Sequence, residues 1–297
     1  FANIKAQADA TLNSRGLFWK ISHEDDEHVS WLFGTMHKSD ERILNLPRNV
    51  QAALDAAQTF VGELDGSKTA YEMGLIMSET PELMFQPEGQ NLSDNLSDET
   101  VAQVDKLLNE RGMDFDQLDP LQPWLSASML ASTLCDVEMD LADTNFLDVA
   151  MENTARAAGK AIVGLETVRQ QINAIGGIDK SFFYKSLDDA AQQHRDGIYD
   201  DLLQSITEIY LDEEIGVMLP LMMHYSYSLK EGEADMRSFQ RELLDIRNQG
   251  MVEKSAELID QGSAFIAVGA LHLIGETGVV EGLRNEGYTV ERVMLER

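Results

Sequence analysis

The stretches SWLFGTMH, residues 30–37, and SAFIAVGALH, residues 263–272, follow one plan although they lie near opposite ends of the sequence. Each is a continuous apolar run that passes into Gly-x-x-His, ending at His37 in the first stretch and at His272 in the second. Short apolar runs bounded by glycine are typical of buried strands with helices packed on both faces. We therefore expect two buried strands, one from each end of the chain, that each deliver a histidine.

Four more strand-like runs accompany these two, mostly near the chain ends. The patterns between them are helical, with apolar residues spaced three and four apart. The sequence therefore predicts an α/β fold, a single domain over residues 1–297. Both ends of the chain form its central mixed sheet, and large helical insertions cover about 85–145 and 180–235. The four runs are GLFWKIS at 16–22, TFVGEL at 59–64, KAIVGLE at 160–166 and GYTVERVM at 287–294.

Three helix boundaries can be read from local signals. In residues 96–112, Ser97 is a good N-cap, acidic residues fill the first turn and Gly112 is a stop. In the same way, we expect the helix of residues 235–250 to end at Gly250.

The two halves of the chain also show a weak internal similarity. TFVGELD and AIVGLET each place a glutamate, Glu63 or Glu166, at the exit of a glycine-containing strand. The two Gly-x-x-His stretches place a histidine at the same point. The repeat is too short to establish duplication, but it involves polar as well as apolar residues, so we expect two weakly related halves.

Composition excludes several classes of function. The chain has 52 acidic and 23 basic residues, a formal net charge of −29, which argues against nucleic-acid and membrane-surface partners because it repels phosphate. The single cysteine, Cys135, rules out an intramolecular disulfide and a thiolate metal cluster, and we interpret it as a small core residue on a helix. The most apolar stretch, residues 215–229, is too short to cross a membrane and is interpreted as a core helix.

The chain begins with Phe1 rather than Met, which we interpret as removal of an upstream segment such as a signal peptide. We expect a periplasmic or exported protein, and a cytoplasmic one stays open. The expected partner is a peptide or small-molecule substrate, and a homo-oligomer is compatible with the sequence.

The densest cluster of polar residues, SHEDDEHVS at residues 22–30, is not expected to be a site. A zinc-binding helix needs histidines four apart with a glutamate beside the first, whereas His23 and His28 are five apart between two predicted strands. We interpret this segment as a solvated hairpin turn. His194 and His224 have no partner motif and are set aside.

His37 and His272 occupy a more informative position. In open α/β sheets, functional groups collect just beyond the carboxyl ends of strands. Gly34 and Gly269, which open the two Gly-x-x-His motifs, would let the backbone turn sharply or approach a ligand closely.

Carboxylates are expected at the same edge. Glu63 and Glu166 each follow a buried strand, where a carboxylate is costly unless it is paired, hydrogen-bonded or metal-bound. Asp65 would point the same way as Glu63 on an extended backbone. Imidazole and carboxylate without thiolate suit Mn, Fe, Co or Zn. Arg247, beside Asn248 near a helix end, is as compatible with a surface position as with a site.

With these residues, the sequence resembles the TraB/PrgY/GumN family. This family is related to the TIKI proteases and more distantly to erythromycin esterases and ChaN-type haem-binding lipoproteins. The resemblance lies in GLFWKIS…SWLFGTMHKSD, in TFVGELD, in GKAIVGLETVRQQI and, most specifically, in the segment from RNQG at residue 247 to GYTVERV. Little of it lies in the helical middle.

The resemblance implies that His37 and His272 form the paired Gly-x-x-His signature, that Glu63 and Glu166 are its glutamates and that Arg247 is the arginine before asparagine. TIKI-type relatives are metal-dependent peptidases that use Mn or Co, whereas erythromycin esterase relatives use a His–Glu site reported without metal.

We therefore expect a metal-dependent, peptidase-like hydrolase. His37, Glu63 and His272 would hold Mn, Co or Zn, which lowers the pKa of bound water. Glu166 would act as general base or further ligand. Arg247 would stabilise the oxyanion or a substrate carboxylate, or instead hold the glutamates in place.

Substrate contacts are expected from Gly34, Gly269 and Asn248. Two alternatives stay open: a metal-free esterase-type hydrolase with a His–Glu site, and a non-catalytic protein that binds haem or a peptide through the same histidines.

Overall fold

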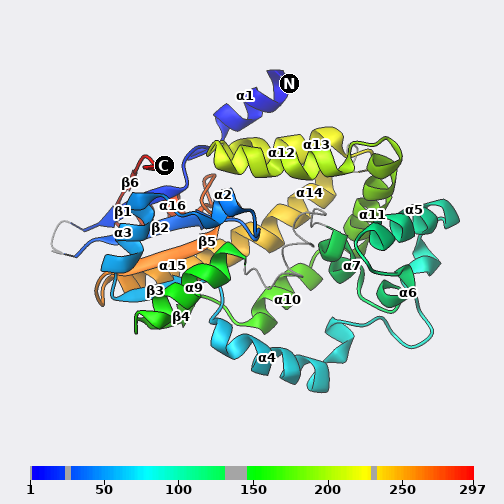
Figure 1. The fold of residues 1–297 in the computed structure, drawn as a ribbon, viewed down its shortest axis with the longest axis horizontal. Helices are drawn as coiled ribbons and strands as arrows, with labels where there is room; N and C mark the ends of the chain where they lie inside the picture. The colour runs from blue at the N-terminus through cyan, green and yellow to red at the C-terminus, as the bar shows by residue number, and fades with distance from the viewer. Residues whose placement is uncertain (1, 24–27, 131–145, 229–232) are drawn as a thin grey trace.

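The computed structural model describes residues 2–23, 28–130, 146–228 and 233–297 (Figure 1). In these residues, one six-stranded sheet has the order β4-β3-β5-β2-β1-β6. Every strand predicted from the sequence is present, and strands from both ends of the chain lie side by side as expected. The strands are β1 Phe18–Ser22, β2 Ser30–Thr35, β3 Thr59–Gly62, β4 Ala161–Gly164, β5 Ala264–Gly269 and β6 Thr289–Arg292.

The sheet is mixed, and its parallel part is continuous. β4, β3, β5 and β2 are parallel neighbours, whereas β1 is antiparallel to both β2 and β6. The carboxyl ends of the four parallel strands therefore lie along one edge of the sheet, called the carboxyl edge below. This is the edge at which open α/β sheets carry ligand sites.

Apolar side chains alternate between two cores, one on each face of the sheet. In β5, Phe265 belongs to the core that includes α3 and α9, while Ile266 belongs to the core that includes α15 and α16. Phe60 and Val61 of β3 divide in the same way, because successive strand side chains point to opposite faces. Helices therefore cover both faces, and this explains why the strands read as continuous apolar runs.

Helices account for most of the remaining described chain, and those of the two insertions gather beside the sheet with cores of their own (Figure 1). The helices are α1 Ala2–Ala10, α2 Glu41–Leu44, α3 Arg48–Ala56, α4 Gly66–Glu79, α5 Asp98–Glu110, α6 Phe115–Leu118, α7 Pro123–Leu130, α9 Leu147–Ala157, α10 Val168–Gly176, α11 Lys180–Arg195, α12 Tyr199–Leu211, α13 Met218–Tyr225, α14 Glu233–Gln240, α15 Ile246–Ile259 and α16 Val279–Asn285, with 3₁₀ turns at Pro81–Leu83, Leu92–Asn95, Ile215–Val217 and Ala270–His272 and a π turn at Arg241–Asp245.

One helix boundary was predicted well and another was wrong. Ser97 caps α5, its side chain accepting from the Thr100 backbone N–H. Gly250 does not end its helix, because α15 continues to Ile259. Beyond the glycine, Met251 and other apolar residues pack in the core on that face of the sheet, and this burial outweighs the cost of about 1 kcal/mol for glycine inside a helix.

His23 and His28 lie away from the carboxyl edge, as expected. β1 and β2 pair antiparallel, so both histidines lie at the start of β2, whereas His37 follows its end. Residues 24–27, interpreted above as part of a hairpin turn, and Cys135, interpreted above as a core residue on a helix, lie outside the described residues.

Among the helices that the structure describes, none combines the length and apolarity needed to cross a bilayer.

We expect the aromatic side chains at the centre of the sheet to contribute strongly to the free energy of unfolding. Phe265 has no exposed surface and packs against Phe33 and Phe60. Phe265→Ala should lower the free energy of unfolding by about 3–5 kcal/mol, through lost burial and the cavity left behind. Urea denaturation measures the change. Tyr71→Ala, which removes an aromatic ring that is 71% exposed, is the control and should stay within about 0.5 kcal/mol. Equal losses would contradict the assignment of the core.

Candidate functional site

The two Gly-x-x-His motifs leave neighbouring parallel strands at nearly the same level. In the register of β2 and β5, Gly34 lies opposite Val268 and Thr35 opposite Gly269. His37 therefore follows β2, and His272 follows β5 on a 3₁₀ turn, both at the carboxyl edge. The sequence prediction that strands from opposite ends of the chain bring both histidines to one edge is confirmed.

The two glutamates are also brought to the carboxyl edge by neighbouring parallel strands. β3 and β4 are parallel, with Gly62 opposite Gly164, and the pairing continues past the strands because the Glu166 N–H donates to the Glu63 carbonyl at 2.8 Å. A Cβ on Gly164 would lie 2.5 Å from the backbone nitrogen of Asp65. Glycine is therefore needed there for the two chain segments to approach.

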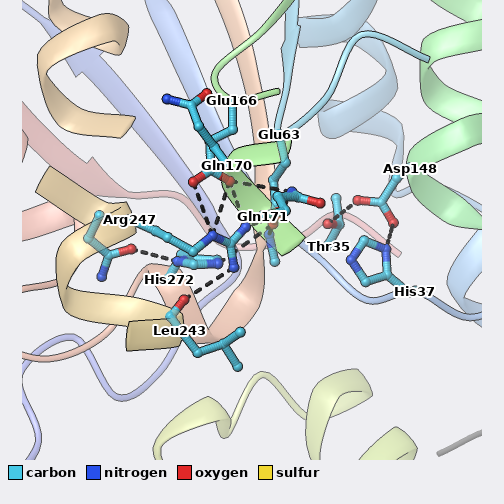
Figure 2. A network of polar contacts seen from close by, with 12 residues as sticks. Thr35, His37, Glu63, Asp148, Glu166, Gln170, Gln171, Leu243, Arg247 and His272 are labelled. Atoms are coloured by element: carbon cyan, nitrogen blue, oxygen red, sulfur yellow. Dashed lines mark hydrogen bonds and ion pairs between the residues drawn. The ribbon is translucent and has the colours of Figure 1, made fainter. Parts of the chain in front are cut away.

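Arg247 of α15 binds both glutamates (Figure 2). Its Nη2 lies 2.7 Å from Glu63 Oε2 and 2.8 Å from Glu166 Oε2, and its Nε donates to both Glu166 oxygens at 3.0 and 3.1 Å. The exposed fractions of the three side chains are only 9%, 11% and 8%. These residues form a buried ion triad, named below as the Arg247 triad.

A break in helical geometry accompanies the triad. The turn Arg241–Asp245 is a π turn between α14 and α15, and Arg247 Nη1 donates to the carbonyl of Leu243 within it at 3.1 Å. Such turns are common at functional sites. Burial would lower the pKa of Arg247, but Glu166 and Glu63 outweigh burial and raise it, so the guanidinium stays charged.

Asn248 fixes the ring of His272. The Asn248 amide nitrogen donates to the Thr277 carbonyl at 3.0 Å, so its oxygen faces His272 Nδ1 at 2.6 Å. Nδ1 therefore carries the proton, and Nε2 presents its lone pair 3.8 Å from Glu63 Oε1. Burial, with the nearby Arg247 and His37 cations, lowers the pKa of His272 to about 4 against the pull of Glu63.

The Nδ1 of His37 is also held by a side-chain oxygen, but this oxygen belongs to a carboxylate and not to a neutral amide. Its Nδ1 donates to Asp148 Oδ2 at 2.8 Å, and the Thr35 hydroxyl donates to the other Asp148 oxygen. The hydrogen bond to Asp148 raises the pKa of His37 to about 9, helped by the charges of Asp148 and Glu63. The His37 side chain is itself 66% exposed. Each signature histidine thus has Nδ1 anchored and Nε2 left for another ligand.

Glu63 is the residue on which these groups converge. Its Oε1 accepts from the Gly269 backbone N–H at 2.7 Å, and its Oε2 accepts from Arg247 and from Gln171 Nε2. Burial pushes the pKa of Glu63 up, but the charges of His272, Arg247 and His37 and the Gly269 N–H hold it down at about 2. Glu63 is therefore a carboxylate throughout the physiological range.

The two signature glycines have packing roles here. A Cβ on Gly34 would lie 2.6 Å from Leu273 and 3.1 Å from Ala270, and one on Gly269 would lie 3.2 Å from Glu63 Oε1. Gly34 therefore lets the two motifs pack together, and Gly269 lets its N–H reach Glu63. That these glycines and Asn248 contact substrate stays a prediction.

Sequence reasoning missed three site residues. Asp148 and Thr35 hold His37, and Gln171 donates to Glu63 and Glu166 at 3.0 and 3.3 Å. Gln171 has a signal in the sequence, since it lies in the GKAIVGLETVRQQI segment. Asp148 gives no such signal, because an acidic residue in the first turn of a helix is commonplace.

Three other residues weighed from the sequence lie outside the site. Asp65 caps α4 by accepting from the Ser67 N–H. His194 lies 3.3 Å from Glu110, and the exposed His224 packs on Tyr225.

As they stand, no three His, Cys, Asp or Glu side chains among the described residues form a group that could hold a metal ion. His37 faces Asp148, and Glu63 is bonded to Arg247. The donor atoms nevertheless fit a divalent ion in their chemistry. Ligating histidines typically donate their second ring nitrogen to a carboxylate or carbonyl, as both histidines do here. The three-ligand site stays a prediction.

The two histidines should titrate in opposite directions in metal-free protein. NMR titration should give a pKa near 9 for His37 and near 4 for His272. Stability contributed by the His37–Asp148 pair should be present below pH 6.5 and lost as the pH rises through about 9. Stability from neutral His272 should be lost as the pH falls from 6.5 through about 4. Asp148→Asn should move the pKa of His37 towards 6.5 and leave His272 unchanged; unmoved values for His37 would refute the pairing.

Removing the cation of the Arg247 triad should be costly. Arg247→Met leaves two buried carboxylates uncompensated and should destabilise the protein by about 3–5 kcal/mol in urea unfolding. Arg42→Met is the matched control, because Arg42 also binds two carboxylates, Asp40 and Glu208, but is 49% exposed; it should cost at most about 1 kcal/mol. A similar small cost for both variants would show that the triad is not a buried unit.

Comparison with known proteins identifies relatives of the chain in sequence. The family model for TraB/PrgY/gumN proteins matches residues 17–292. Metalloprotease TIKI2 of Danio rerio is 24% identical over 318 aligned residues, which cover 92% of this chain and 60% of TIKI2. The chain thus spans about three fifths of the length of that relative. No solved structure matches the chain.

The family match extends from β1 to β6 and so takes in both Gly-x-x-His motifs, both glutamates and Arg247. The chain belongs to the TraB/PrgY/gumN family.

Proposed function

We propose that this chain is a metal-dependent hydrolase of the peptidase type. The observation that carries the proposal is the shared arrangement of His37 and His272. In both, Nδ1 is bonded to an acceptor and Nε2 is left for another ligand, and the Nε2 of His272 lies 3.8 Å from Glu63 Oε1. His37, Glu63 and His272 would hold the divalent ion, Mn, Co or Zn. The resemblance to a metalloprotease supports the reaction class.

A divalent ion held by His37, Glu63 and His272 would lower the pKa of bound water towards neutrality and polarise a substrate carbonyl. The protein supplies orientation and charge. Asn248 and Asp148 fix the imidazole tautomers, and Gly269 and Gln171 fix the carboxylate of Glu63.

Within the Arg247 triad, Glu166 is the proposed general base, and Arg247 mainly positions the carboxylates. A guanidinium has five N–H donors, and the contacts to Glu63, Glu166 and Leu243 use four of them. One donor on Nη1 is left for a developing oxyanion. Removing one such donor typically costs 10²–10³-fold in kcat. In a variant without Arg247, this loss would add to the loss that follows from misplaced carboxylates.

A second candidate is a metal-free esterase-type hydrolase. It is favoured by the charge balance of the site, in which Arg247 compensates the two glutamates and His37 pairs with Asp148. Neutral His272, 3.8 Å from Glu63, would then act as the general base. Sensitivity to chelators separates the two candidates.

Metal binding and turnover should depend on the same residues. Protein purified without a metal-chelating tag should bind about one Mn, Co or Zn ion by elemental analysis, and chelation should abolish hydrolysis of a peptide library. His272→Ala should lose the ion, and Asn248→Ala should weaken affinity about 10–100-fold, as for other residues that orient ligands.

His224→Ala removes an exposed histidine that lies outside the site. It is the control and should keep full metal content. Full metal content in His272→Ala would sink the assignment of the ligands. Peptide or ester hydrolysis that survives complete metal removal would instead favour the metal-free candidate.

A further inference from the structure

A small cavity adjoins the carboxyl edge beside Glu63. Its volume is about 220 Å³, and the site residues His37, Glu63 and Gln171 contribute to its lining. Phe60 of β3 and Ala267 of β5 contribute to its lining, which places it on the α9 face of the sheet. The remaining apolar side chains that line it are Leu64, Phe146 and Val149.

The volume suits part of a substrate rather than a whole ligand. A dry apolar cavity of about 150 Å³ holds one benzene molecule, whereas sites for complete drug-sized molecules measure about 300–1,000 Å³. A cavity of about 220 Å³ therefore has room for one branched aliphatic or aromatic group. It is too small for a macrocycle such as haem.

The charges along the wall argue against a basic side chain as the occupant. Asp148 already accepts from Thr35 and His37. Glu152 accepts from the Gly66 N–H at 3.0 Å and pairs with Arg156. Because the carboxylates that line the cavity have protein partners, a lysine or arginine would lose its hydration without gaining a free counter-ion.

We propose that this cavity binds one branched aliphatic or aromatic side chain of the substrate, next to the carbonyl that is attacked. The inference rests on the proposed function for the position of the cleaved bond. The cavity is next to the proposed metal site because two of the proposed ligands, His37 and Glu63, line it. Burial of such a group should favour it over glycine or alanine by at least tenfold.

Binding can be measured without any turnover. In metal-free protein, methyl NMR during titration with N-acetyl-leucinamide should show saturable shifts at Leu64 and Ala267, and N-acetyl-lysinamide should show none. Val149→Trp should abolish the shifts by filling the cavity, and it should fold because Val149 is 43% exposed. Asn153→Trp, exposed on the same helix, is the control. Absent shifts, or shifts unchanged in Val149→Trp, would overturn the proposal.

Cleavage gives the second readout. A peptide library should show at least a tenfold preference in kcat/KM for Leu or Phe over Ala beside the cleaved bond. Val149→Trp should remove this preference, and the control Asn153→Trp should keep it. Leucyl and alanyl esters, tested in parallel, show whether the apolar group belongs to a peptide or to an ester.

The two failures can be told apart. Probe binding without hydrolysis of any peptide or ester would refute the proposed function and leave the cavity assignment standing. Hydrolysis without a preference for apolar groups, together with no probe binding, would refute the cavity assignment and leave the proposed function standing.

Discussion

The structure of the site depends on the buried ion triad of Arg247, Glu63 and Glu166. Two carboxylates at adjacent strand ends would repel each other and could not both stay charged in a buried position without a cation. The guanidinium holds both in one planar fork. Glu63 is therefore a fixed carboxylate, and the histidines, the Gly269 N–H and Gln171 are arranged around it.

The two signature histidines are equivalent in the sequence but not in their surroundings. His272 is buried against the amide of Asn248 and stays neutral, whereas His37 is paired with the carboxylate of Asp148 and is cationic without a metal. A divalent ion binding to both would have to displace the proton from His37. Metal binding at this site should therefore release a proton, as is usual where ligands must be deprotonated.

Whether a feature of the fold or the site could be predicted from the sequence depends on how far apart in the sequence its residues lie. Strand ends are local patterns, so the parallel strands and the positions of His37, His272, Glu63 and Glu166 were predictable. The contact between His37 and Asp148 joins residues 111 apart and leaves no local pattern. The path of α15 through Gly250 was missed because tertiary packing, rather than helix propensity, decides it.

Anomalous diffraction from crystals soaked with Mn²⁺ would locate a metal ion at the carboxyl edge, where we propose a metal centre ordered by the Arg247 triad. We expect one peak within about 2.0–2.3 Å of the Nε2 atoms of His37 and His272 and a Glu63 oxygen, with Arg247 still bonded to Glu166. A peak elsewhere, ligation through Nδ1, or no peak at saturating Mn²⁺ would contradict this proposal.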